Sequence, residues 1–240
     1  MATVAELTGP YGAFMLNPPS PATPSVCRVC LTFTDGYSTC YRCGFQSEFA
    51  DAVLPVSYSI HFGQLHTILG AYKRASPQAA GPLQMQLAAV LWRFLALHET
   101  CLARAAGAER FDLVTTVPSG VASRDDAHPL RRIVSTIVEP TRDRFERLLM
   151  RSGTPVPERS VDPLKYSPTM DLSGESVLVI DDTWTTGANA QSASGALKTT
   201  GAGAVAVLVI GRHIHESYQD NAARLRALPK PFDWSTCAWH

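Results

Sequence analysis

The chain has 240 residues, of which 45% are hydrophobic and 18% charged, a balance typical of a globular protein and not of a disordered one. Lysine plus arginine and aspartate plus glutamate each total 21, so the formal net charge is zero and no overall field attracts DNA, RNA or an anionic membrane. The longest apolar run, 204–210, is far shorter than the roughly 20 residues that cross a bilayer, and the N-terminus lacks a secretory leader pattern. We therefore expect a cytoplasmic protein without a membrane partner, and we do not expect nucleic acid as a partner.

From the N-terminus, residues 1–25 are expected to form an extended lead-in, because 17–24 are rich in proline. Residues 26–50 contain four cysteines and are expected to form a zinc ribbon. The remaining residues, 51–240, are expected to form one domain. A hood element is expected around Val53–Tyr72, to which the C-terminus could add.

Four of the six cysteines form two pairs, Cys27-x-x-Cys30 and Cys40-x-x-Cys43. Four thiolates at about 2.3 Å from one ion complete the tetrahedral shell of structural zinc, which leaves no open position for catalysis. Two disulfides or idle thiols are the alternative, which a reducing compartment disfavours. Cys101 and Cys237 stand alone in the sequence; Cys101 falls in a helical pattern and is predicted to be a small buried apolar residue.

After the ribbon, apolar patterns and their interruptions predict strands that alternate with helices, which indicates a parallel sheet covered by helices on both faces. Residues 52–68 are expected to form a strand or hairpin. The other expected elements are a helix over 83–106, a strand over 111–117, a helix over 129–151, a mobile loop over 152–170, a strand over 176–180, a helix over 188–200 and a strand over 204–210.

The most informative stretch is Val177–Asn189, in which a buried strand is followed by two carboxylates, threonines and a glycine that open a helix. Ligands of open α/β sheets bind at the carboxyl ends of strands. The threonine hydroxyls and the amides of a helix N-terminus favour an anion, and the carboxylates can accept from vicinal hydroxyls, so the parts suit a phosphorylated sugar. The P-loop and dinucleotide fingerprints are both absent from the sequence.

This stretch resembles the thirteen-residue motif that binds phosphoribosyl pyrophosphate (PRPP) in type I phosphoribosyltransferases, and the four-cysteine knuckle ahead of it resembles the ComF-like branch, which is associated with DNA uptake. The resemblance implies an α/β fold with a parallel sheet flanked by helices and a small N-terminal zinc ribbon. It implies that the catalytic residues Asp181 and Asp182 contact the ribose hydroxyls. The implied 5′-phosphate site consists of Thr183, Thr185, Thr186, Gly187 and Ala188.

Two alternatives stay open within this motif. The acid pair could merely cap a helix, with the threonines as turn residues. Trp184 departs from the smaller residues usual in the family, and it could either stack on a substrate or pack beneath the loop.

A second loop, after the strand over 111–117, has the position at which the family binds pyrophosphate through backbone amides. The residues expected to bind PRPP there are Pro118, Ser119, Gly120 and Arg124. An ordinary strand-to-helix connection is the alternative.

The sequence of 124–132 departs from the family pattern at this loop, which puts catalysis in doubt. Arg124, Arg131 or Arg132 could clamp diphosphate oxygens, or could be solvated on a helix surface. His128 could protonate a leaving group, or could be incidental.

The loop over 152–170 is the candidate lid, because the family closes a mobile loop over the reaction centre to exclude water. Arg159 and Lys165 are the lid residues expected to reach the pyrophosphate, with a disordered connector as the alternative.

The function implied by the resemblance is transfer of a phosphoribosyl group from PRPP to a nitrogen nucleophile, a nucleobase or small amine, with release of pyrophosphate. Mg²⁺ and fixed amide dipoles would stabilise the charged leaving group. The cofactors expected are thus structural Zn²⁺ and Mg²⁺, the partners are PRPP and an unidentified acceptor, and a homodimer is possible. The alternative is a catalytically silent PRPP or nucleotide sensor, or an accessory protein of DNA uptake; a single-stranded DNA binder is a third class, which zero net charge disfavours.

Overall fold

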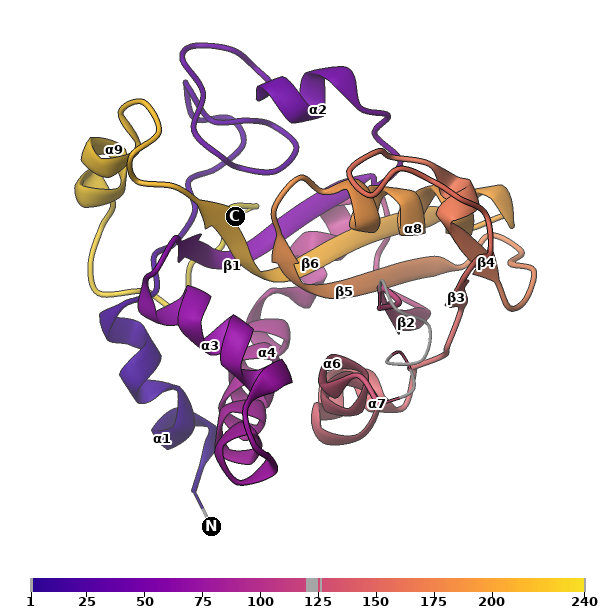
Figure 1. Ribbon diagram of the computed structural model, residues 1–240, viewed down its shortest axis with the longest axis horizontal. Helices are drawn as coiled ribbons and strands as arrows, with labels where there is room; N and C mark the ends of the chain where they lie inside the picture. Colours follow the sequence, from indigo (N-terminus) through magenta and orange to yellow (C-terminus); the bar gives the residue numbers. More distant parts are fainter. Residues whose placement is uncertain (1, 120–124, 126, 240) are drawn as a thin grey trace.

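The computed structural model describes residues 2–119, 125 and 127–239, and at their centre lies a four-stranded sheet whose strands all run parallel (Figure 1). The strand order is β1 (Ala52–Ile60), β6 (Ala204–Ile214), β5 (Ser176–Trp184) and β2 (Leu113–Thr116). The chain is therefore an α/β protein, as the alternation of patterns predicts. Because parallel strands end at one edge, the carboxyl ends of β5 and β6 lie together.

Both faces of the sheet are covered, and the central strands β5 and β6 carry buried apolar residues on both sides for this reason. Along β5, Leu178 and Ile180 pack with the core that contains α4, whereas Val177 and Val179 pack with the core that contains α8. Successive apolar residues of β5 thus pack alternately into the core on one face of the sheet and the core on the other.

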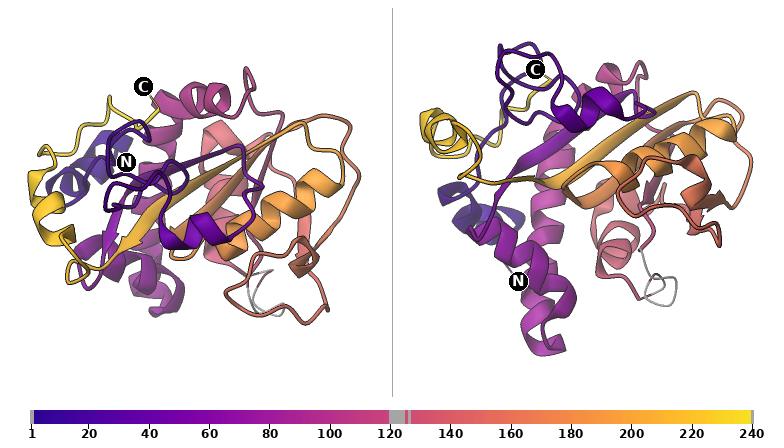
Figure 2. Two further views of the ribbon diagram at one scale, coloured as in Figure 1. Left: turned by 90° about the horizontal axis from the view of Figure 1, so that it is seen from above. Right: turned by 45° about the horizontal axis from the view of Figure 1, so that its top comes forward.

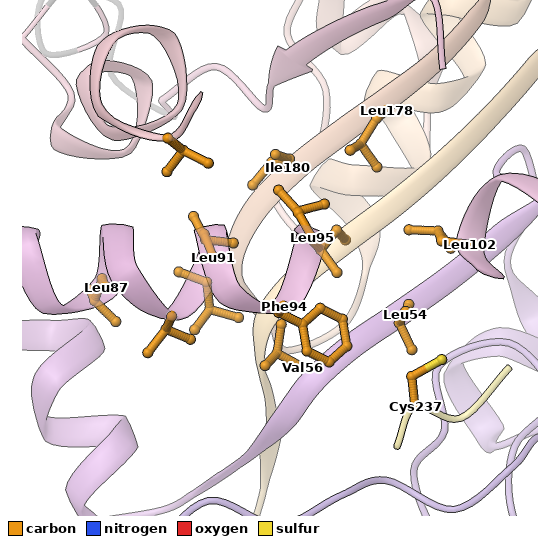
Figure 3. Close-up of a cluster of buried hydrophobic side chains, with 14 of the residues drawn as sticks. Leu54, Val56, Leu87, Leu91, Phe94, Leu95, Leu102, Leu178, Ile180 and Cys237 are labelled. Carbon is orange, nitrogen blue, oxygen red and sulfur yellow. The ribbon is translucent and has the colours of Figure 1, made fainter. Parts of the chain in front are cut away.

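One face carries α3 (Gln64–Arg74) and α4 (Pro77–Ala105), together with α6 (Pro129–Arg132) and α7 (Glu139–Arg142) (Figure 1). The opposite face carries α8 (Ala188–Thr199) and the cysteine segment with α2 (Tyr41–Phe45), while α9 (Asn221–Ala227) follows β6 beyond the sheet (Figure 2). Leu87, Leu91 and Phe94 of α4 are buried at 0–2% exposure, and Figure 3 shows Phe94 beside Val56 of β1. The core helix predicted over 83–106 is confirmed, and it begins six residues earlier at Pro77.

The first residues of the chain differ from the extended lead-in expected over 1–25. Residues Val4–Thr8 form α1, and Gly9–Ala13 form a 3-10 helix. The side chains of Tyr11, in this 3-10 helix, and of Met15, just after it, are each 1% exposed. Thr3 caps α1 by accepting from the backbone N–H of Glu6, whose carboxylate accepts in return from the Thr3 N–H. The proline-rich residues that follow form turns and irregular structure. Apolar side chains between α1 and the prolines hold this segment against α4.

The segment over 52–68 is a strand followed by a helix, so a hairpin is not formed. β1 ends at Ile60, and Gly63 is the N-cap of α3 and not a hairpin turn. Within the region expected to contribute to a hood, Val53 lies in the central sheet and is paired with Val207 of β6.

The long helix predicted over 129–151 is interrupted. After α6 the chain makes one wide turn over Ile133–Ile137, leaves helical geometry at Val138 and forms only the four residues of α7. Pro140 explains the break, because it has no N–H for the helical ladder and its ring clashes with the carbonyl one turn earlier. The last residues of the predicted helix instead form β3 (Leu149–Arg151).

The segment over 152–170, which is expected to be a mobile loop, contains regular structure and packs on the rest of the molecule. β3 pairs with β4 (Tyr166–Pro168) as an antiparallel hairpin, and a 3-10 turn over Pro163–Lys165 packs on α8. Asp162 donates its backbone N–H to Ser192 of α8 at 2.9 Å. Among the described residues, no helix combines the length and the apolar character that crossing a bilayer requires.

The packed N-terminal segment gives a test by side-chain truncation. We expect Met15→Ala to lower the free energy of unfolding by about 2–5 kcal/mol, the range for a buried methionine, whereas Met85→Ala, at a side chain that is 46% exposed, should change it by about 0.5 kcal/mol or less. Urea unfolding followed by circular dichroism measures both. Equal, small effects of the two substitutions would mean that the segment is not part of the core.

Candidate functional site

The acid pair lies within β5, because the strand continues through both carboxylates to Trp184. Side chains alternate along a strand, so Asp181 and Asp182 point to opposite faces of the sheet. Asp182 lies on the face of α3 and is 3% exposed, whereas Asp181 lies on the face of α8 and is half-buried. The two carboxylates therefore do not form one acceptor surface in this structure.

Asp182 is held by two neighbouring residues of α3. The Tyr72 hydroxyl donates to its Oδ2 atom, and the Lys73 ammonium forms an ion pair with the same oxygen. Burial, followed by the charge of Asp182, raises the pKa of Tyr72 well above its usual range, so this hydroxyl stays protonated and keeps donating. Neither Tyr72 nor Lys73 was singled out by sequence reasoning, and only the fold brings α3 against β5.

Asp181 has a different environment. Burial, followed by the neighbouring charge of Asp182, raises the pKa of Asp181 to about 7, although the Lys73 charge opposes the change. Its Oδ1 atom accepts from the backbone N–H of Asp182 at 2.8 Å. Near neutral pH this carboxyl is therefore divided between its acid and its base forms.

The loop after the acid pair is shaped by Gly187 and Trp184. Gly187 has φ +80°, a left-handed conformation that glycine adopts without strain, and it is the N-cap of α8. The Trp184 side chain is 2% exposed and lies directly beneath the glycine, where a Cβ would come within 2.1 Å of the indole ring. Of the two alternatives for Trp184, packing beneath the loop is thus the one observed.

The buried guanidinium of Arg212 fixes the same loop from β6. Its Nη1 atom donates to the carbonyl oxygens of Trp184 at 3.1 Å, Thr185 at 3.2 Å and His213 at 2.6 Å. Burial alone would lower the pKa of Arg212, but the adjacent Cys30 sulfur raises it above its ordinary value. Arg212 therefore connects the loop to the cysteine cluster, a role that the sequence did not reveal.

A cavity of about 1110 Å³ opens at this edge of the sheet, between the end of β5, α3 and the segment before α6. Four of the residues expected to bind PRPP line it: Ser119, Asp182, Thr183 and Thr185. The cavity also has lining residues that were not predicted, which include Lys73, Arg74, His66 and His213. The cations and hydroxyls on these walls suit an anionic, hydroxylated ligand.

The other predicted residues of the motif lie outside the lining of this cavity. Asp181 points to the opposite face, Gly187 and Ala188 are buried, and Thr186 accepts from the Ala188 N–H at 3.3 Å. Ala188 is the first residue of α8, so the helix N-terminus does follow the threonines as expected.

The second loop is organised by Asp125, which the sequence analysis did not single out. Its Oδ1 atom accepts the backbone N–H of Ser119 at 2.7 Å, and its Oδ2 atom is paired with the Arg131 and Arg147 guanidinium groups. The Ser119 amide expected to bind pyrophosphate is thus occupied by a carboxylate of the chain. Pro118 is buried, and Gly120 and Arg124 lie outside the described residues.

Histidines surround the outer part of the cavity. His128 lines it, and burial followed by the charge of Lys73 lowers the pKa of His128. A separate group, His61, His213 and His215, presents ring nitrogens that lie within 4.8 Å of one another and could hold a metal ion.

The two lid candidates lie away from the cavity. Lys165 is 1% exposed, and its ammonium donates to the carbonyl oxygens of Glu158 at 3.0 Å and Ser160 at 2.9 Å. It also donates to Asn189 of α8 at 3.3 Å. Arg159 is exposed, and its carbonyl accepts from Gln46 at 3.3 Å. In this structure Lys165 fastens its segment to α8, and neither residue lines the cavity.

The four cysteines of the predicted knuckle converge. Their sulfur atoms all lie within 4.8 Å of one another, and Cys30 and Cys40 are separated by 3.7 Å. Four sulfurs at about 2.3 Å from a tetrahedral zinc ion would be about 3.8 Å apart, so the donor set and its spacing fit zinc. Cys27, Cys30 and Cys43 belong to the same buried core as Trp184 and α8. The cysteine segment is therefore packed on the sheet and is not a detached appendage.

No protein-family model and no curated protein matches this sequence, so the functional argument rests on the geometry of the site itself.

The contact between Gly187 and Trp184 gives a prediction. We expect Gly187→Ala to lower the free energy of unfolding by about 1–2 kcal/mol for the left-handed backbone and by about 1–3 kcal/mol more for the overlap with the indole ring. Gly153→Ala is the matched control, because a Cβ there meets nothing within 4 Å. Chemical denaturation compares the variants, and similar stability of both would contradict the loop geometry.

The raised pKa of Asp181 gives a second prediction. An aspartate whose folded pKa lies above its unfolded value of 3.8 contributes stability that is lost as pH rises towards about 7. Asp181→Asn keeps an acceptor for the Asp182 N–H but cannot ionise. The stability of this variant relative to wild type should therefore rise between pH 4 and pH 7 and then level off. A difference in unfolding free energy that does not change with pH would contradict the raised pKa.

Proposed function

We propose that the chain is a phosphoribosyltransferase that binds PRPP at the carboxyl edge of its sheet and transfers the phosphoribosyl group to a nitrogen nucleophile with release of pyrophosphate. The observation that carries the proposal is the carboxyl-terminal part of β5, which holds two acids and is followed by a threonine loop that opens α8 beside a cavity of about 1110 Å³. The parallel sheet and the cysteine cluster agree with the resemblance to ComF-like phosphoribosyltransferases.

The polar groups of the loop suit a phosphate monoester. Thr183 and Thr185 line the cavity with hydroxyl donors, and Thr185 is exposed. The first amides of α8 have no partners within the helix and favour an anion through the helix dipole. We assign the 5′-phosphate to this loop, and the ribose hydroxyls to Asp182.

Asp182 has to be released before it can accept from a ribose. Its Oδ2 atom is shared by Tyr72 and Lys73, and Lys73 is the half-buried partner, so its side chain can turn to the cavity. A diphosphate in the cavity would attract both Lys73 and Arg74. Ligand binding is thus expected to exchange the Lys73–Asp182 pair for contacts of both residues with the ligand.

The Asp182 carboxylate and the oxygen atoms of a bound PRPP are also suitable ligands for Mg²⁺. Mg²⁺ prefers oxygen ligands and keeps several waters, so one carboxylate from Asp182 and the oxygens of the ligand suffice to hold it. When bound, the ion neutralises charge on the departing diphosphate. The chain's own contribution is to hold the sugar phosphate and to supply fixed positive charge from Lys73 and Arg74 beside the diphosphate.

A catalytically silent PRPP sensor is the second candidate. Two observations favour it: the Ser119 amide is occupied by Asp125, and Asp181 points away from the cavity. These two features leave fewer groups that could contact a diphosphate leaving group. They do not change the threonine loop before α8, to which the 5′-phosphate is assigned. This candidate predicts binding without turnover.

Binding and turnover separate these possibilities. We expect PRPP with Mg²⁺ to bind in calorimetry, and Thr185→Val to weaken the affinity at least tenfold, because a hydrogen bond to a charged phosphate contributes about 1.5–3 kcal/mol. Thr154→Val, at an exposed threonine outside the cavity, should leave the affinity unchanged. Pyrophosphate release in the presence of a panel of nucleobases and small amines then reports transfer.

Release that depends on one acceptor and falls in the Thr185→Val variant supports the transferase. Binding without release from any acceptor supports the sensor. Absence of PRPP binding would overturn both.

A further inference from the structure

Three histidines come together where β1 and β6 leave the sheet, beside the cavity. The two strands are parallel with Ile60 opposite Ile214, and the His61 N–H continues the pairing by donating to the Ile214 carbonyl oxygen at 2.8 Å. His61 therefore follows β1 at the level at which His215 follows β6. His213 and His215 are two residues apart at the end of a strand, so strand geometry places both on one side of the chain.

The three rings are close enough to bind one metal ion together. His61, His213 and His215 each offer a ring nitrogen, and these three atoms lie within 4.8 Å of one another. The Nε2 atoms of His213 and His215 are 3.3 Å apart, a contact in which one ring donates to the other. Two nitrogens at about 2.0–2.1 Å from a tetrahedral zinc ion would be about 3.3–3.4 Å apart, so a zinc ion can replace the shared proton.

The hydrogen bonding of His61 is incomplete. Its Nδ1 atom is shielded from solvent and has no hydrogen-bond partner among the described residues. A buried polar atom in this condition is rare and calls for an explanation, of which a bound ion is one. The next residue, Phe62, has φ +62°, a left-handed conformation that is costly for an aromatic side chain. Strained residues of this kind cluster at binding and catalytic sites.

His66 of α3 lies beside the three histidines but does not offer them a further ligand. Its ring centroid is 5.1 Å from that of His213, and its Nδ1 atom accepts from the Phe62 N–H at 3.2 Å. In a neutral imidazole the proton is then on Nε2, so His66 presents a donor and no lone pair. Both His66 and His213 line the cavity. His66 is therefore placed to donate a hydrogen bond to an oxygen atom bound next to the three rings.

We propose that His61, His213 and His215 bind a zinc ion at the rim of the cavity and leave its fourth position open for water or for an oxygen of an anionic ligand. Imidazole suits zinc, and three protein ligands with one open position are the arrangement of catalytic zinc sites. Three neutral imidazoles leave the charge of Zn²⁺ uncompensated, which favours an anion in the fourth position. Lys73 and Arg74 line the same cavity, so phosphate is the expected class of ligand.

This inference does not depend on the proposed transferase activity. The Mg²⁺ of that proposal prefers oxygen ligands, whereas the three ligands here are ring nitrogens. The zinc ion also differs from the one expected at the four cysteines, where a shell of thiolates leaves no open position.

Zinc binding by the full chain tests the proposal. At equilibrium with a buffered concentration of free zinc, the wild type should hold one zinc ion more than the His213→Ala/His215→Ala variant, as measured by atomic absorption. His128→Ala is the matched control, because it removes a half-buried histidine of the same cavity outside the cluster and should keep the wild-type zinc content. Equal zinc content of the wild type and the double variant would overturn the proposal.

Cobalt identifies the ligands. One equivalent of zinc is added first, which the softer thiolates take up. Cobalt added next should absorb in the visible without a sulfur-to-cobalt charge-transfer band, because ring nitrogens and an oxygen bind it. Since loss of an outer contact alone weakens metal binding about 10–100-fold, His215→Ala should weaken cobalt binding at least about tenfold. His215 is exposed, so circular dichroism should show an unchanged fold. A sulfur band, or unchanged cobalt affinity in the folded variant, would contradict the site.

Inorganic phosphate tests the fourth position. It should shift the visible absorption of the bound cobalt by replacing water, and His66→Ala should weaken phosphate binding while the cobalt affinity stays as in the wild type. Absence of a phosphate-dependent shift, or loss of cobalt affinity in His66→Ala, would contradict a three-histidine shell with an open position.

Magnesium separates this site from the proposed function. An excess of Mg²⁺ should leave the cobalt absorption unchanged, because imidazole is a poor ligand for magnesium. Displacement of cobalt by Mg²⁺ would contradict the nitrogen ligand set. Failure of Mg²⁺-dependent PRPP binding would overturn the proposed function and leave the zinc site standing.

Discussion

The candidate site depends on one buried cation, the Arg212 guanidinium. A charged group that is 7% exposed costs free energy unless it is paired, and Arg212 is paired on two sides. On one side it donates to the carbonyl oxygens of Trp184 and Thr185, and on the other the Cys30 sulfur stands beside it. A four-thiolate zinc site would supply the negative charge that retains the guanidinium in the interior. The conformation of the phosphate loop and the integrity of the cysteine cluster are therefore coupled through one side chain.

The second constraint is the two-sided burial of the sheet. Because alternate residues of β5 enter different cores, the adjacent carboxylates of Asp181 and Asp182 enter different environments. Asp182 contacts the Tyr72 hydroxyl and the Lys73 ammonium of α3, whereas burial and the charge of Asp182 raise the pKa of Asp181 to about 7. Two identical side chains thus acquire separate properties from strand geometry alone.

Local sequence signals predicted β5, α4 and the grouping of four cysteines that could hold a metal ion. The cysteine spacing, the apolar run of β5 and the periodicity of α4 act over short distances, and the structure confirms each of them. Local sequence signals did not predict the contacts that a residue makes with segments distant in the sequence. Lys165 looked like a free lid cation, but α8 covers it; the Ser119 amide looked available, but Asp125 occupies it. Composition alone also could not show that helix α1 packs on α4, because that contact joins the first residues to a helix some eighty positions away.

The edge strand β1 has a consequence for the order of folding. Its hydrogen-bonded neighbour in the sheet is β6, with Ala52 opposite Ala206, so β1 emerges from the ribosome long before its partner exists. Contacts between residues so far apart in sequence form late and slow the folding of a chain. The cysteine segment immediately before β1 closes over only a few residues, and metal capture there needs no distant partner. The four cysteines are therefore all available for metal binding before β6 is synthesised, whereas β1 has to wait for β6 before it can enter the sheet.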